Sequence, residues 1–214
     1  HVNKLIIQNN KCVGVETTQK GRTVIMRCKC EVIISAGAIN SPQLLELSGI
    51  GPENVLKKLG IEVKSALPGV GENLRDHYAP RMKWTTLKGR YTYNDRARGI
   101  GIALEIAKYF TTRRGFLAMP AAPMRAYVRS REGLVAPDLG ISVNPFLIKS
   151  GVSLDKSSGF TMAVHPLRPE SCGSVHIASS CSTTPPIIKY NFLSKKIDKD
   201  TLVSGMKIVR QWVN

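Results

Sequence analysis

The sequence predicts an α/β region up to about residue 75, followed by a larger sheet with one wet face and helices at its flanks. A short, nearly continuous apolar run at 31–36, EVIISA, is typical of a strand buried on both faces of a parallel sheet. Helical periodicity follows from Ser41. Beyond His77, segments of alternating apolar and polar residues, such as RAYVRS and SVHIAS, recur at intervals.

Three strands are predicted at the start of the chain. Residues 2–8, VNKLIIQ, and 11–18, KCVGVETT, have the composition of strands, and the two successive asparagines between them are a hairpin turn signal. A Lys-Gly turn precedes a third predicted strand over 21–30. These segments predict a small antiparallel sheet.

Two short helices are predicted next. Ser41 is suited to the N-cap and Pro42 to the first helical position, while Leu44, Leu45 and Leu47 form an apolar face. Two glycines then end the helix. The second helix, PENVLKKLG, is expected to start at its proline and end at its glycine. An extended, glycine-rich segment, IEVKSALPGVGENLRDH, follows.

The second part of the chain is predicted to combine strands with two longer helices. RMKWTTL is a predicted strand, and Asn94 or Asp95 is suited to cap a helix over about 96–112, which two glycines weaken. A final helix is expected from near Asp198. Five further strands are expected in MRAYVRS, PDLGISVNPF, GFTMAVHPL, GSVHIAS and PIIKYNFL.

The composition allows a sizeable core, since 43% of the 214 residues are hydrophobic and 21% are charged. No apolar run reaches the roughly 20 residues that cross a bilayer. The net charge of +16 invites a nucleic-acid, membrane or anionic-ligand interpretation. Because the cations are spread along the chain without interleaved aromatic residues, a solvated basic surface is favoured and no nucleic acid is expected as a partner.

Five cysteines at irregular spacing predict neither a disulfide framework nor a metal site. A reducing, cytoplasmic location is therefore expected, with contact at a membrane surface left open. The chain opens in mid-strand without an initiator Met and stops inside a predicted helix. We therefore expect a fragment of a longer protein.

A side-chain-poor junction, Ala36, Gly37 and Ala38, separates the predicted strand from the predicted helix. A ligand can approach the main chain there, and the unpaired N–H groups of a helix N-terminus favour phosphate. Tight packing of a strand on a helix favours the same small residues. On these residues alone, both interpretations stay open.

The stretch 37–51, GAINSPQLLELSGIG, resembles the second signature of the glucose–methanol–choline (GMC) oxidoreductase family: a small pair, Ser-Pro, two aliphatic residues, then Ser-Gly-aliphatic-Gly. GIEVKSALPGVGENLRDH is similar to a further segment of that family. AYVRS, PDL, HPLRPESCGSVHIAS, PPIIKYNFLS and DTLVSGMKIVRQ follow in the order of choline-dehydrogenase-like members. The likeness spans almost the whole chain.

This resemblance implies part of a split, Rossmann-like FAD-binding domain over 1–75, and a substrate-binding domain over 76–214 with a mainly antiparallel sheet and flanking helices. It implies FAD as cofactor, a small primary alcohol as substrate, and oxidation to an aldehyde by hydride transfer to flavin. Oxygen, a quinone or a dye-like molecule is implied as electron acceptor. The alternatives are a lyase that keeps FAD without net redox, and a non-catalytic basic module that binds polyanions.

The resemblance implies cofactor contacts at nine positions. These residues are Val2, Ser35, Ala36, Gly37, Ser41, Pro42, Asn73, Asp76 and His77. For the last three, a structural role in the crossover between domains is favoured. Nothing in the chain resembles the GxGxxG loop or the catalytic histidine segment of the family. Catalytic residues are therefore expected beyond residue 214, and the chain alone is expected to be inactive.

Overall fold

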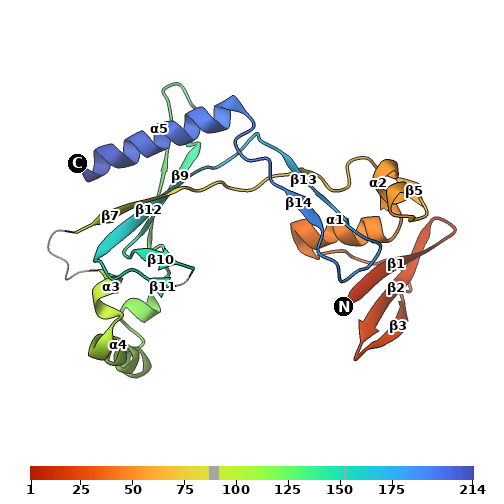
Figure 1. The fold of residues 1–214 in the computed structure, drawn as a ribbon, viewed down its shortest axis with the longest axis horizontal. Helices are drawn as coiled ribbons and strands as arrows, with labels where there is room; N and C mark the ends of the chain where they lie inside the picture. Colours follow the sequence, from red (N-terminus) through yellow and green to blue (C-terminus); the bar gives the residue numbers. More distant parts are fainter. Residues whose placement is uncertain (87–91, 152) are drawn as a thin grey trace. The chain divides into compact units, whose positions relative to one another are not determined.

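The computed structural model describes residues 1–86, 92–151 and 153–214 (Figure 1). Contacts divide the chain into two compact units. Unit 1 comprises His1–Asp76 and Ser171–Ser194, and unit 2 comprises His77–Glu170 and Lys195–Asn214. The chain therefore returns to unit 1 after residue 170. The assignment of 1–75 to the cofactor and of 76–214 to the substrate stays a prediction.

Unit 1 opens with an antiparallel meander of β1 (Val2–Gln8), β2 (Lys11–Gln19) and β3 (Arg22–Arg27). Asn9 and Asn10 join β1 to β2 with φ of 49° and 58°, the left-handed region that asparagine tolerates. The predicted hairpin and third strand are confirmed, although β3 stops three residues short of the predicted end.

The predicted strand over 31–36 is wrong. These residues form no strand, and Ile33 is 80% exposed. A strand buried on both faces needs neighbouring strands and covering helices. No described residue pairs with this segment, so its apolar character alone does not make it a strand.

The helix predicted from Ser41 begins earlier. In α1 (Gly37–Leu47), Ala36 is the N-cap and Pro42 lies inside the helix, so the predicted roles of Ser41 as cap and of Pro42 as first residue are wrong. Gly37 has φ of 82°, and this conformation, which is strained for other residues, turns the chain into the helix.

The buried face of α1 also differs from the predicted leucine face. Gln43 and Glu46 are the buried residues, whereas Leu44, Leu45 and Leu47 are half-buried. Hydrophobicity therefore does not decide which face packs here. Hydrogen bonds to Glu46, described below, compensate the cost of burying its carboxylate.

The rest of unit 1 is built from short elements: β4 (Ile50–Gly51), α2 (Glu53–Lys58), β5 (Ser65–Ala66), β6 (Glu72–Leu74), β13 (Gly173–His176) and β14 (Ile187–Lys189). Strands β14, β13 and β6 form an antiparallel sheet in that order, and β4 pairs with β5 in parallel. The sheet places the returning segment beside α1, which contacts β13.

Unit 2 centres on a four-stranded antiparallel sheet in the order β7-β12-β9-β8. Its elements are β7 (Arg81–Thr85), α3 (Tyr93–Arg96), α4 (Gly99–Thr112), the 3-10 helix η1 (Phe116–Ala118), β8 (Met124–Val128), β9 (Leu139–Asn144), β10 (Ile148–Ser150), β11 (Ser153–Leu154), β12 (Gly159–Pro166) and α5 (Lys196–Val213). Leu87, in the predicted strand RMKWTTL, lies outside the described residues. The predicted strands and the final helix are otherwise present.

The helix predicted over 96–112 is two helices, because the chain turns between α3 and α4. Thr92 is the N-cap of α3, not Asn94 or Asp95. Asp95 instead completes a capping box with Thr92, and Asn94 is buried. Its amide donates to the main-chain oxygens of Leu147 and Asp155, at 2.9 Å each, and accepts from the Leu147 N–H at 2.7 Å.

The chain is thus a mixed α/β structure with several antiparallel sheets, as predicted in outline. The split Rossmann-like topology of the first part stays a prediction.

Candidate cofactor site

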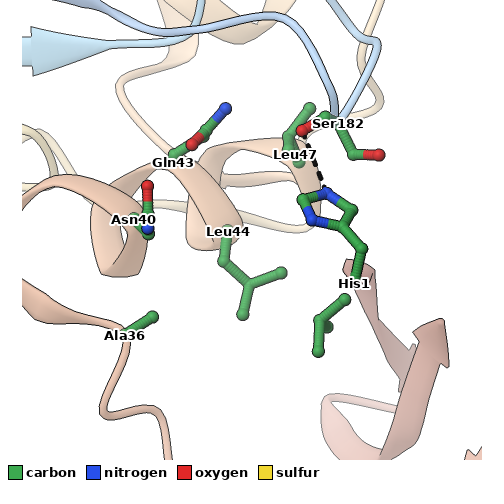
Figure 2. Close-up of a pocket in the computed structure, with 8 residues that line it drawn as sticks. His1, Ala36, Asn40, Gln43, Leu44, Leu47 and Ser182 are labelled. Carbon is green, nitrogen blue, oxygen red and sulfur yellow. Dashed lines mark hydrogen bonds between the residues drawn. The ribbon is translucent and has the colours of Figure 1, made fainter. Parts of the chain in front are cut away.

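A cavity of about 240 Å³ in unit 1 brings the start of β1 together with one face of α1 (Figure 2). It is lined by His1, Val2, Ala36, Asn40, Gln43, Leu44, Leu47 and Ser182. Val2 and Ala36 are therefore neighbours in space, although they lie far apart along the chain. The sequence had predicted both as contacts of one cofactor.

The N-terminus of α1 meets this cavity without a side-chain cap. Ala36 has no side-chain group that accepts a hydrogen bond, and the first turn holds no acidic residue. The first N–H groups of a helix have no partner within the helix and carry the positive end of its dipole. This end of α1 is therefore suited to an anionic group such as a phosphate.

Gly37 lies beside open space and lines neither of the two cavities of unit 1 described in this section. A Cβ placed there would meet no heavy atom within 4 Å. Tight strand–helix packing would put neighbours at this point, and the described residues supply none. Glycine is needed for the backbone conformation, while the space beside it is open to a ligand.

Two long-range hydrogen bonds hold the far wall of the cavity. Gln43 Nε2 donates to the main-chain oxygen of Thr184 at 3.0 Å, and His1 Nε2 lies 3.1 Å from the main-chain oxygen of Ser182 (Figure 2). These contacts fix the returning segment against α1 and β1. Asn40, in the first turns of α1, is exposed at the edge of the cavity.

The sequence interpretation missed most of this lining. With α1 starting at Gly37, the helical spacing places Ala36, Asn40, Gln43 and Leu47 on one face. The late predicted start hid this pattern. Ser182 carried no signal, since its contribution depends on the return of the chain to unit 1.

A second cavity of about 460 Å³ lies elsewhere in unit 1. It is lined by Ala38, Pro42, Gly71, Glu72, Asn73, Leu74, Arg75 and Val175. Pro42 and Asn73, both predicted cofactor contacts, meet here rather than beside Val2. Asn73 adopts φ of 61°. Ser35 is exposed and Ser41 half-buried, and neither is among the residues lining the two cavities.

The last two predicted contacts lie where the units meet along the chain. Asp76 is the last residue of the first stretch of unit 1, and His77 begins unit 2. The His77 ring centroid lies 4.6 Å from that of His165, and its Nε2 lies 3.3 Å from the main-chain oxygen of Leu167. Within unit 2, His77 therefore packs at the end of β12.

An ion cluster with one buried member ties α1 to the sheet beside the second cavity. Glu46 is fully buried; its Oε1 lies 2.7 Å from His176 Nδ1, and its Oε2 accepts from the Ile177 N–H at 2.8 Å. His176 Nε2 lies 3.0 Å from Glu72 Oε1. Burial lowers the pKa of His176, but hydrogen bonds and the negative charge from both glutamates outweigh it, so the pKa is raised.

Among the described residues, no group of three or more His, Cys, Asp or Glu side chains is arranged to hold a metal ion. No helix within the described ranges is long and apolar enough to cross a bilayer.

Comparison with known proteins identifies the class of this chain. Residues 1–79 match the family model described as GMC oxidoreductase. The likeness to curated members continues over nearly the whole chain. The chain therefore belongs to the GMC oxidoreductases, and the family resemblance read from its signature is confirmed.

The relatives give the family match more detail. The chain is 34% identical over 209 residues to oxygen-dependent choline dehydrogenase from Photobacterium profundum, covering 97% of this chain and 37% of the relative. It is 36% identical over 202 residues to the enzyme of the same name from Brucella ovis, covering 91% of this chain and 36% of the relative. The chain thus spans little more than a third of the length of these relatives.

Solved structures show the same fold. A formate oxidase from Aspergillus oryzae RIB40, described for its FAD modification, aligns with a TM-score of 0.87 at 22% identity, covering 98% of this chain and 42% of that chain. An FAD-dependent oxidoreductase from Chaetomium thermophilum aligns with a TM-score of 0.83 at 21% identity, covering 100% of this chain and 43% of that chain. These neighbours are flavoproteins, as predicted for the class of this chain.

Proposed function

We propose that the chain belongs to an FAD-dependent enzyme that oxidises a primary alcohol to an aldehyde. It supplies the surface that holds the nucleoside part of FAD, and the sheet of the substrate domain. The observation that carries the proposal is the cavity shared by Val2 and Ala36 at the uncapped N-terminus of α1. Membership of the GMC family and the FAD-dependent neighbours support the choice of cofactor.

Bound FAD would supply the acceptor for the hydride that leaves the alcohol carbon. The residues of this chain bind and orient. The main-chain N–H groups at the start of α1 would donate to phosphate oxygens, and the side chains of Leu44 and Leu47 would give the nucleoside an apolar wall. No residue of the chain is assigned as the base that takes the hydroxyl proton.

The cofactor site is tested by flavin absorbance of the full-length protein and by two matched substitutions. Ala36→Leu places a larger side chain at the lining of the first cavity, and we expect flavin affinity to fall at least tenfold. Ala66→Leu makes the same change at an exposed position of β5, outside both cavities, and serves as the control. If both variants retain flavin equally, the first cavity does not hold the nucleoside part of FAD.

Gly37→Ala refines this test. Gly37 and Gly60 have φ of 82° and 69°, and in both a Cβ would meet nothing within 4 Å. Each alanine substitution should therefore cost about 1–2 kcal/mol of stability through backbone strain. We expect only Gly37→Ala to weaken flavin binding as well, measured by fluorescence titration of the apoprotein.

The same preparation distinguishes the other classes of protein. Flavin that is bound but not reduced by any alcohol would indicate a lyase. Absence of flavin together with salt-sensitive heparin binding would indicate a polyanion-binding module. Reduction by an alcohol, followed by reoxidation with oxygen or only with a quinone or dye, would identify the electron acceptor.

Contact with a membrane surface is a further part of the proposal. Helix α4 exposes Ile100, Leu104 and Phe110 at 81%, 64% and 68%, while Glu105 is its buried residue. An exposed apolar stripe beside basic residues such as Lys108 and Arg114 suits an anionic bilayer surface. Sedimentation with anionic and with neutral vesicles would test it.

A further inference from the structure

The four-stranded sheet of unit 2 has one covered face and one polar face. Gly205 of α5 packs so closely on the sheet that a Cβ there would lie 2.6 Å from Val164 Cγ1 and 2.9 Å from Leu139 Cδ2. Val164 and Leu139 therefore face α5. Because side chains alternate along a strand, Thr161 and Ala163 point to the opposite face.

Register identifies what else lies on that opposite face. Thr161 pairs with Lys83 on one side and Asn144 on the other, and Ala163 pairs with Arg81 and Ser142. Ser142 in turn pairs with Arg125 of β8. Directly opposed residues share a face, so three cations stand on this side of the sheet. Arg125 also helps to lower the pKa of His165, on the same face, after burial and the charge of His77.

A cavity of about 310 Å³ opens on this polar face. It is lined by Arg81, Lys83, Asn144, Phe146, Ile148, Lys149, Ser150, Gly151 and Thr161. Three of these nine residues are cationic and none is acidic. The strand β10 contributes Lys149, which joins the two cations of β7.

The positive charge of the cavity is only partly compensated. Lys83 Nζ donates to the main-chain oxygen of Ile148 at 2.6 Å, which is a neutral acceptor. Asp155 is a carboxylate that interacts electrostatically with Lys83 and Lys149. The pKa of Asp155 is lowered chiefly by a hydrogen bond from the Ser157 N–H. Burial opposes this shift, and the charges of the two lysines lower the pKa further. One carboxylate against three cations leaves a positive excess.

One neutral group of the lining also lacks a partner. The Oδ1 atom of Asn144 is buried and accepts no hydrogen bond from the described residues. A buried acceptor without a donor costs free energy unless a ligand or water supplies one. Because this atom has almost no accessible surface, a molecule in the cavity does not reach it, and the excess positive charge alone carries the inference.

We propose that this cavity binds the anionic end of the substrate, so that the alcohol oxidised carries a carboxylate or phosphate group. The inference rests on the proposed function, since it concerns the substrate of that enzyme. Arg81, Lys83 and Lys149 pair with the anion. A quaternary ammonium, the group that distinguishes choline, is repelled by the same cations.

The test compares alcohols of similar size and different charge on the full-length, flavin-containing protein. The probes are 3-hydroxypropanoate, 2-hydroxyethyl phosphate, 1-butanol and choline. We expect kcat/KM to be at least tenfold higher for one of the two anions than for 1-butanol, and lowest for choline. The stronger of the two anions identifies carboxylate or phosphate as the recognised group.

Matched substitutions locate the effect in the cavity. Arg81→Gln and Lys149→Gln should each lower kcat/KM for the anionic alcohol about tenfold and change that for 1-butanol less than twofold. Lys207→Gln removes an exposed cation from α5, outside the cavity, and should change neither. Calorimetric titration with 3-hydroxypropanoate and with 2-hydroxyethyl phosphate, without turnover, should show the same order of affinities.

The outcomes separate this inference from the proposed function. Flavin reduction by 1-butanol or choline in preference to both anions would overturn the inference and leave the proposed function standing. Equal losses in the cavity variants and in Lys207→Gln would overturn it too, because a long-range charge effect would then be responsible. If flavin is absent, the proposed function fails, and the calorimetric titration decides alone whether the cavity binds the anion.

Discussion

Unit 1 and unit 2 each gather charged side chains beside a sheet, but they treat these charges differently. In unit 1, Glu46, His176 and Glu72 are linked by hydrogen bonds, and the buried member is fully satisfied. In unit 2, Arg81 and Lys149 line a cavity without an acidic residue. Removing one partner of a neutralised, buried cluster destabilises the fold, whereas charges left in excess are available to a ligand.

The two histidines of these regions show the same contrast. His176 lies between two carboxylates and its pKa is raised. The pKa of His165 is lowered by burial first, and then by the positive charges of His77 and Arg125. The pKa values of these two half-buried histidines thus shift in opposite directions, because the charges of their neighbours differ in sign.

The largest expected effect comes from breaking the compensated cluster. Glu46→Ala removes the acceptor of the buried Ile177 N–H and one partner of His176, and should lower the free energy of unfolding by about 3 kcal/mol. Amide hydrogen exchange at Ile177 should accelerate with it. Glu53→Gln, at an exposed ion pair with Lys57, is the control and should cost less than about 0.5 kcal/mol. Equal effects of the two substitutions would contradict a structural role for the cluster.

A smaller effect is expected in the pH dependence of stability. The folded-state pKa of His176 lies above its unfolded value, so its stabilisation is fully present below the unfolded pKa and is lost as pH rises through the folded pKa. For His165 the folded pKa lies below the unfolded one, so stability is lost as pH falls through that interval.

Urea unfolding between about pH 5 and pH 9 measures the contributions of both histidines to the free energy of unfolding. This range includes the ordinary histidine pKa of about 6.5. His176→Gln should remove a contribution that favours the acid side, and His165→Gln one that favours the alkaline side. Both tryptophans, Trp84 and Trp212, lie in unit 2, so fluorescence follows that unit and hydrogen exchange is needed for unit 1. Slopes that change in the same direction in both variants would refute the comparison.

The smallest expected effect has the opposite sign. Arg81→Gln removes one charge from the uncompensated face, so it should leave stability unchanged or raise it by about 0.5 kcal/mol or less. Thermal denaturation at low ionic strength is the measurement, because added salt screens the repulsion. A marked loss of stability would show that the cations of unit 2 hold the fold rather than a ligand.

Local signals in the sequence predicted the elements whose neighbours are close along the chain. The turn at Asn9 and Asn10 was readable because asparagine tolerates left-handed backbone, and alternation located β8 and β13. The family resemblance assigned Val2 and Ala36 to one cofactor. Both residues line one cavity, and their contact with the cofactor stays a prediction.

Elements that depend on distant partners escaped prediction. The run at 31–36 looked like a buried strand, but pairing needs neighbours that its own residues do not specify. The helical pattern singled out the leucines of α1 and not Glu46, whose partner His176 lies 130 positions away along the chain. The cation cavity was equally hidden, because Arg81 and Lys149 meet only through the sheet register and the β10–β11 hairpin.

The buried Asn94 has a consequence for that hairpin. Its side-chain amide forms hydrogen bonds with the main chain of Leu147, just before β10, and of Asp155, just after β11. One side chain from α3 therefore fixes both ends of the hairpin that carries Lys149. The position of Lys149 beside the cavity therefore depends on Asn94, a residue that does not line the cavity.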